Sequence, residues 1–170
     1  MLNKLMNIIN GLEERDLMNG ITEEDINELG FILIRNSDLL PMYNMAIAGA
    51  FMANKELVGK DNIPMIVVDD YFYSLSDNAK AFIIGHELGH FQNEHEKQYE
   101  SYVRKIDDEF EADEYGAKLV GYQSAIFAIV EMVDMFKDLY EGFEEEIKDT
   151  IDEFEIRIEK LLNKKNMICM

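Results

Sequence analysis

Residues 76–94 form the segment that most constrains how this chain of 170 residues can fold. Ser76 and the two polar residues after it are of the types that cap helix N-termini, and no proline follows before residue 95. In a helix, His86 and His90 would lie about 40° apart on one face, one turn from each other. The segment therefore predicts a helix from which two imidazoles can reach the same metal ion.

The residues between these histidines complete the pattern His-Glu-Leu-Gly-His, an HExxH motif. Zinc that supports hydrolysis takes three protein ligands and keeps one position open. Glu87 lies about 100° round the helix from His86, which suits contact with a water on the metal better than direct ligation. The motif therefore predicts His86 and His90 as zinc ligands and Glu87 as a general base. The alternative is that both histidines are ordinary residues of a helix.

A third ligand must come from another element, and Glu109 is the best candidate. Glu109 and Asp113 are four residues apart, on one face of a helix expected over about 107–120. A metal-bound histidine usually donates its second ring N–H to a carboxylate, which Asp113 can supply. Ala112 and Gly116 keep the same face small, so that two helices can approach closely.

Three other residues remain open as ligands: Glu94, Glu111 and His95. If the helix continues, His95 lies about 140° round from His90 and outside the cluster. We therefore expect His95 to be a surface or helix-capping residue.

The rest of the chain predicts helices on both sides of a small sheet. The expected elements are, in chain order, a helix over 1–18, a helix from Thr22 to about Ile34, strands within 42–52 and 63–68, and helices over 107–120, 123–141 and 143–164. This order predicts an α+β fold with a small, mostly antiparallel sheet packed on the HExxH helix. The expected organisation is a single domain over 1–170, with a helical N-terminal segment (1–36), a catalytic core (42–120) and C-terminal helices (123–164).

Composition narrows the classes of partner and compartment. There are 35 acidic and 16 basic residues, which gives a net charge of −19. This charge opposes binding to nucleic acid and favours binding to basic peptides or proteins. The simpler explanation of the acidic residues is that they form solvated helix faces. Cys169 is the only cysteine, so no internal disulfide can form. Segment 1–18 is charged and unlike a signal peptide, and no apolar run has the length of a membrane span. We expect a soluble, cytoplasmic protein, and the sequence leaves its oligomeric state open.

The motifs together resemble a known family of zinc peptidases. The HExGH pattern is followed by His95, five residues on, and later by the E-x-x-A-D stretch of Glu109 to Asp113. These features resemble the gluzincin metallopeptidases that include the HtpX heat-shock protease and the CaaX prenyl endoproteases. The resemblance covers residues 42–120, and compact soluble members called minigluzincins are the closer comparison.

This resemblance implies a zincin-like fold, a bound Zn²⁺ and endopeptidase activity in which Glu87 acts as general base toward a metal-activated water. It implies that Glu109 is the third ligand, in agreement with the spacing. It also implies that Asn44, Met45 and Ala46 belong to an edge strand to which a peptide or protein substrate adds as a further strand.

One departure from the family concerns the transition state. Family members commonly carry Thr-His-Pro-Pro seven residues before an Arg-Ile pair, and the histidine is the expected donor to the developing oxyanion. Here Thr150 stands seven residues before Arg157, but no histidine lies between them. Arg157 is one candidate replacement. The others are tyrosines: Tyr43, Tyr99, Tyr102, Tyr115 and Tyr122.

Two rival functions remain open at this point. The missing histidine and the strong acidity are compatible with a catalytically weak or inactive module that holds a peptide on the same scaffold. A second rival is a regulatory metalloprotease that cleaves repressors. Proteases of that kind usually have Asn where this chain has Asp113, which favours the HtpX-like group.

Overall fold

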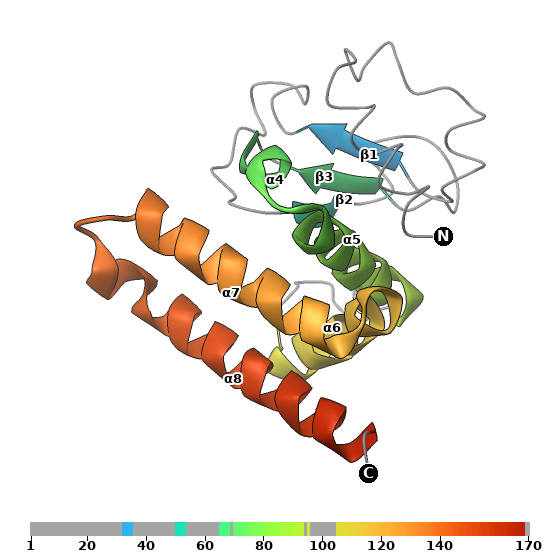
Figure 1. The fold of residues 1–170 in the computed structure, drawn as a ribbon. Coiled ribbons are helices and arrows are strands. Elements are labelled where there is room, and N and C mark those ends of the chain that lie inside the picture. Colours follow the sequence, from blue (N-terminus) through green and yellow to red (C-terminus); the bar gives the residue numbers. More distant parts are fainter. Residues whose placement is uncertain are drawn as a thin grey trace. The chain divides into compact units, whose positions relative to one another are not determined.

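The structure is a computed structural model of the chain, and it describes residues 32–35, 50–53, 65–68, 70–93, 95 and 105–168. The chain divides into two compact units, Met1–Ser74 and Leu75–Met170, where the sequence predicted one domain. Each unit is treated by itself below, with the elements labelled in Figure 1.

The first unit contains a three-stranded sheet and a short helix. Strands β1 (Ile32–Arg35) and β2 (Ala50–Ala53) flank the central strand β3 (Met65–Val68). β1 runs parallel to β3, whereas β2 runs antiparallel to it. Helix α4 (Asp70–Ser74) follows β3 directly.

This unit corrects two predictions. The helix expected from Thr22 to about Ile34 is wrong at its end, because Ile32–Arg35 is a strand; its short run of apolar, partly β-branched residues favours a strand over a helix. The sheet is mixed and not mostly antiparallel, because β1 pairs with β3 in parallel. The helix expected over 1–18 and the residues Asn44 to Ala46 lie outside the described part of the chain.

The described part of the second unit contains four helices (Figure 1): α5 (Asp77–Gln92), α6 (Ile106–Val120), α7 (Tyr122–Leu139) and α8 (Glu144–Ile168). Over the described residues of 75–168 the chain is 88% helical and contains no strand. The predicted α+β, zincin-like architecture is therefore wrong for this unit. The physical reason is that α5 packs on α6 and α7, so its partners within the unit are helices.

Helix α5 begins at the predicted cap. Ser76 has an extended backbone (φ −63°, ψ 156°), and its Oγ accepts a hydrogen bond from the Ala79 N–H at 3.3 Å. Glu131 of α7 accepts from both the Ser76 N–H and the Ser76 hydroxyl, each at 2.6 Å. The start of α5 is thus bound to the middle of α7.

Helices α5 and α6 cross at unusually small residues, as the sequence predicted for α6. A Cβ added to Gly85 would lie 2.9 Å from the Gly116 Cα, and one added to Gly89 would lie 2.9 Å from the Ala112 Cα. Real Cβ atoms essentially never come this close to another heavy atom, so both α5 positions need glycine. The close crossing brings the first turn of α6 beside the last turns of α5.

Helices α7 and α8 complete the core of the unit. One face of α8 is apolar, because Ile147, Phe154 and Leu161 are buried, seven residues apart. The Phe154 ring lies 5.8 Å from that of Phe136 on α7. Arg157 is 3% exposed on the same face of α8, which places one charged side chain inside the helical core.

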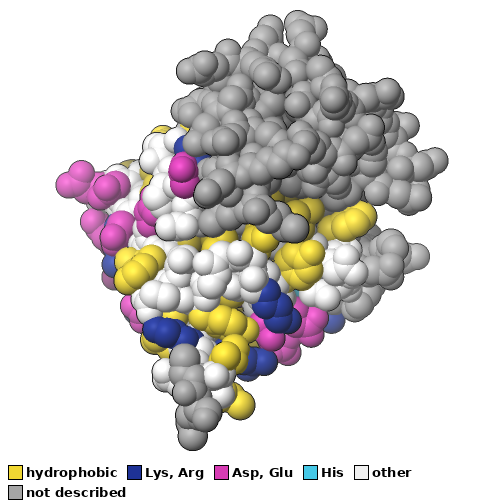
Figure 2. Space-filling view, turned by 45° about the vertical axis from the view of Figure 1, so that its right-hand side comes forward, with side chains coloured by type: hydrophobic (Ala, Val, Ile, Leu, Met, Phe, Trp, Pro, Cys, Tyr) yellow, Lys and Arg dark blue, Asp and Glu magenta, His cyan; other side chains and the backbone are white. Residues whose placement is uncertain are grey.

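The described part of one face of the molecule is mixed in character. Figure 2 shows acidic, basic and apolar side chains interspersed, and no histidine is visible on the described part of that face. None of the described helices alone is long and apolar enough to cross a membrane. Helices α6 and α7, which meet at an angle of 119°, reach the required length and apolar composition only when they are taken together.

The α5–α6 crossing leads to a first prediction. In Gly89→Ala the new methyl group meets the Ala112 Cα and the Tyr115 Cβ, each at 2.9 Å, and neither can move without its helix. Overpacking of this kind costs about 1–3 kcal/mol, against a gain of about 0.5–1 kcal/mol from replacing a helical glycine. Urea denaturation should therefore show a net loss of about 1–2 kcal/mol. Gln92→Ala, at an exposed position of α5, should change the free energy of unfolding by less than about 0.5 kcal/mol. If Gly89→Ala were as stable as the native protein, that result would contradict the tight crossing.

Candidate metal centre

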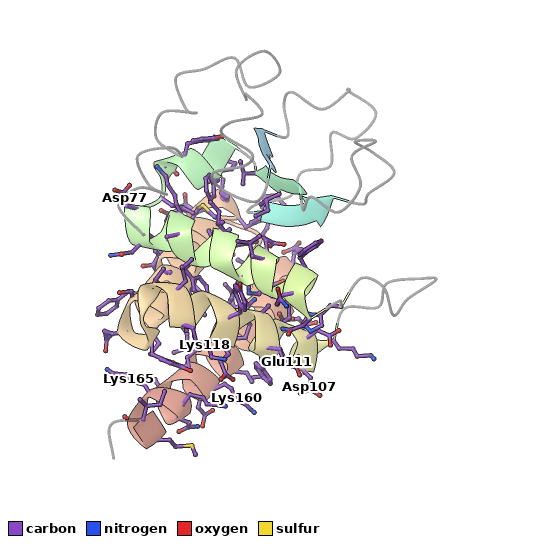
Figure 3. The ribbon with its side chains drawn as sticks, turned by 90° about the vertical axis from the view of Figure 1, so that its right-hand side faces the viewer. Asp77, Asp107, Glu111, Lys118, Lys160 and Lys165 are labelled. Atoms are coloured by element: carbon purple, nitrogen blue, oxygen red, sulfur yellow. The ribbon has the colours of Figure 1, made fainter. Side chains whose placement is uncertain are left out.

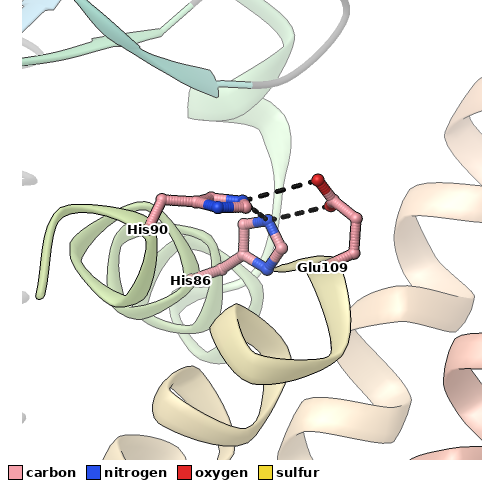
Figure 4. Close-up of side chains that lie close together, drawn as sticks. All are labelled: His86, His90 and Glu109. Atoms are coloured by element: carbon pink, nitrogen blue, oxygen red, sulfur yellow. Dashed lines mark hydrogen bonds and ion pairs between the residues drawn. The ribbon is translucent and has the colours of Figure 1, made fainter. Parts of the chain in front are cut away.

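Three buried side chains from two helices converge on one point (Figure 4). His86 and His90 extend from α5, and Glu109 extends from the first turn of α6. The His86 and His90 Nε2 atoms are 3.0 Å apart, and the Glu109 oxygens lie 3.3 Å from the first and 3.5 Å from the second. The structure therefore brings together the three predicted ligands, each at most 8% exposed.

The spacing of these atoms fits a tetrahedral zinc ion. With metal–ligand distances of about 2.0–2.1 Å, two ligand atoms of a tetrahedral site are about 3.3 Å apart. The three distances of 3.0, 3.3 and 3.5 Å scatter around that value. Two imidazoles and one carboxylate are also a ligand set used by catalytic zinc, with the fourth position left for water or substrate.

A carboxylate supports the first histidine from behind. The Asp113 Oδ1 lies 2.8 Å from the His86 Nδ1, so His86 can donate its outer N–H while its Nε2 faces the metal position. Asp113 is 1% exposed, and Arg157 of α8 holds it with two charged hydrogen bonds, from Nε at 2.7 Å and from Nη2 at 2.6 Å. The predicted role of Asp113 agrees with this geometry.

Arg157 also reaches the third ligand. Its Nη1 lies 3.4 Å from the Glu109 Oε2, and its guanidinium lies 5.1 Å from the Phe154 ring centre. The guanidinium thus joins both carboxylates of α6 to α8. The closest contacts of Arg157 are to Asp113, which lies on the Nδ1 side of His86, away from the metal position. This placement favours a positioning role for Arg157 over the predicted role as transition-state donor. The sequence missed these contacts, although a lone arginine in the apolar stripe of α8 was a signal for them.

The other candidate residues fall outside the cluster or outside the described chain. Glu111 lies 3.3 Å from the His95 Nε2, and its side chain is 65% exposed. His95 contacts His90 on the side away from the metal position. Among the described residues, the recorded polar contacts of the three ligands do not include Tyr115 or Tyr122. Glu94, Tyr43, Tyr99 and Tyr102 lie outside the described residues.

The charges at this centre set opposite pKa shifts on the two histidines. Burial disfavours the charged form of His86, but hydrogen bonds to Asp113 and Glu109 outweigh it and raise the pKa of His86 to about 9. Burial, together with the charge on His86, lowers the pKa of His90 to about 3. For Asp113, burial is outweighed by the charge and hydrogen bonds of Arg157, which keep its pKa below the ordinary value.

These shifts follow from the balance of buried charge. Without a cation at the centre, the carboxylates of Glu109 and Asp113 both face the Arg157 guanidinium, and a proton on His86 offsets part of the remaining negative charge. A divalent ion between the three ligands would take over that task, and the His86 proton would have to leave. The centre therefore fits a cation, and metal binding should compete with protons.

Comparison of the chain with models of protein families, with curated proteins and with solved structures finds no match in any of the three. The functional conclusion therefore depends on the residues of the metal centre and on their geometry.

The pKa shifts predict how the metal-free protein responds to pH. His86 binds its proton more tightly in the folded state, so its contribution to stability is complete below about pH 6.5 and is lost as the pH rises through 9. His90 has the opposite effect, because its lowered pKa costs stability as the pH falls below about 6.5. Chelated protein should therefore lose on the order of 3 kcal/mol between pH 6.5 and pH 9.

Thermal melts of chelated and zinc-loaded protein at these two pH values provide the measurement. The zinc-loaded protein should lack the loss between pH 6.5 and pH 9, because its His86 carries no proton on Nε2. Nitrogen-15 NMR of the chelated protein should show one imidazole that deprotonates near pH 9. An ordinary histidine titration near pH 6.5 for both residues would contradict the charge balance given above.

Proposed function

We propose that this protein is a zinc-dependent peptidase that hydrolyses peptide bonds of a peptide or protein substrate. The observation that supports it is the tetrahedral spacing of the His86, His90 and Glu109 ligand atoms. The carboxylate residue Glu87 directly follows His86 on α5. The resemblance of the motifs to gluzincin peptidases points to the same chemistry. The excess of acidic residues favours basic substrates.

Glu87 is the residue that moves the proton in this proposal. Bound zinc would polarise the substrate carbonyl and lower the pKa of water toward 7. The Glu87 carboxylate takes one proton from the water whose oxygen attacks the carbonyl carbon. As the C–N bond breaks, Glu87 passes that proton to the leaving amine, so the carboxylate is regenerated. Glu87 is buried, with 7% of its surface exposed.

The other residues hold the reacting groups in place. His86 and His90 are fixed one turn apart by α5, and Glu109 is fixed by the glycine-based crossing with α6. Asp113 and Arg157 neutralise and orient the back of the site. Such preorganisation avoids the cost of rearranging charges during the reaction.

A zinc-holding module that binds peptides without rapid turnover is the second candidate, and one observation favours it. Residues 150–157 lie within the uninterrupted helix α8, so this region has no segment comparable to the Thr-His-Pro-Pro of the resembling family. Loss of an oxyanion donor lowers turnover by about 100- to 1,000-fold. Such a protein would bind zinc and peptide but would cleave slowly.

The variant Glu87→Gln separates these functions. It keeps the shape of the side chain but cannot accept a proton, so zinc should remain bound at an unchanged stoichiometry while cleavage of unfolded casein falls by at least about 100-fold. Asp134→Asn, at an exposed position of α7, is the matched control and should retain activity. Unchanged cleavage by Glu87→Gln would contradict the mechanism. Zinc binding without cleavage in the native protein would favour the binding module.

A further inference from the structure

The third histidine of the motif region lies where the sequence did not predict it. Helix α5 ends at Gln92, with Asn93 as its C-cap, so the helical extrapolation to residue 95 does not apply. His95 is instead 3% exposed, and its Nδ1 lies 2.9 Å from the Nδ1 of His90. The two rings are inclined at 72°, with their centres 5.1 Å apart.

Only one arrangement of protons satisfies this contact and the metal position together. The His90 Nε2 faces His86 and Glu109, so it must offer a lone pair to a metal, and the proton of a neutral His90 then lies on Nδ1. Two nitrogens at 2.9 Å need one donor and one acceptor. His95 therefore accepts at Nδ1 and carries its own proton on Nε2.

The second nitrogen of His95 has a partner of the matching kind. Its Nε2 lies 3.3 Å from the Oε2 of Glu111, a carboxylate on α6. Figure 3 shows Glu111 on α6, near Asp107 and toward the end of the helix that begins at residue 106. The side chain of Glu111 is 65% exposed, whereas His95 is buried. A chain of contacts thus runs from a solvated carboxylate through His95 to the metal-facing His90.

We propose that His95 is a positioning residue that fixes the tautomer and ring orientation of His90 for metal binding, with Glu111 in turn fixing His95. The inference rests on the proposed zinc centre but not on peptidase activity. It assigns the two ligands different supports: His86 donates directly to a buried carboxylate, and His90 donates to a neutral ring. Such outer partners of metal ligands typically contribute 10- to 100-fold in metal affinity.

The test compares three variants by zinc affinity, measured in competition with a chelator. His95→Phe keeps a buried ring but removes the acceptor, so zinc should bind about 10- to 100-fold more weakly. His95→Asn places an amide oxygen near the position of the lost Nδ1 and should recover most of the affinity. Glu111→Ala removes the acceptor for the His95 N–H, so zinc should bind more weakly than in the native protein, but by less than about 10-fold, because Glu111 acts one step further from the metal.

A spectroscopic readout distinguishes hydrogen bonding from packing. In zinc-loaded native protein, nitrogen-15 NMR should place the His90 proton on Nδ1 with a downfield N–H signal. The signal should lose its downfield shift in His95→Phe and keep it in His95→Asn. Native affinity in His95→Phe would overturn the inference and leave the zinc centre intact, as would equal weakening in both His95 variants. Absence of zinc binding by the native protein would overturn the zinc centre and this inference together.

Discussion

The close crossing of α5 and α6 is the constraint on which the rest of the site depends. Three ligand atoms can lie within 3.5 Å of one another only if the two helices bring their backbones together. Gly85 and Gly89 on one side, and Ala112 and Gly116 on the other, leave no room for larger side chains at that contact. The same residues also set the register, because α6 must present Glu109 to the metal position and Asp113 to the back of His86. Packing and chemistry are therefore fixed by one interface.

Buried charge joins a third helix to this interface. A guanidinium that is 3% exposed would be costly in a helical core without partners, and Arg157 finds them in the carboxylates of Asp113 and Glu109. Removing any one of these charges leaves the others uncompensated, so the metal centre and the packing of α8 are coupled. Helix α8 thus contributes to the electrostatics of the centre as well as to the apolar core.

Local patterns in the sequence were sufficient for much of the site. The cap at Ser76, the spacing of His86 and His90, and the pair Glu109 and Asp113 all depend on helical periodicity, which acts over a few residues. The apolar face of α8 was predictable for the same reason.

The features that were missed depend on distant contacts or on the end of an element. Arg157 meets Asp113 across 44 residues, and no periodicity within α8 reveals that partner. His95 was misplaced because neither glycine nor proline marks the end of α5 at Gln92. The start of the sheet was mispredicted because a short apolar run such as 32–35 fits either a strand or a helix. The fold class of the second unit was mispredicted because local patterns do not show which elements α5 packs on, and within the unit these are α6 and α7.

Zinc stoichiometry of native and Glu109→Ala protein, measured side by side, tests the central claim most directly. Asp107→Asn, in the same first turn of α6 but exposed, is the matched control. The geometry predicts about one tightly held zinc per chain in the native protein and the control, and much weaker binding in Glu109→Ala, because three protein ligands are required. Undiminished zinc affinity in Glu109→Ala, or no zinc in the native protein, would contradict the metal centre.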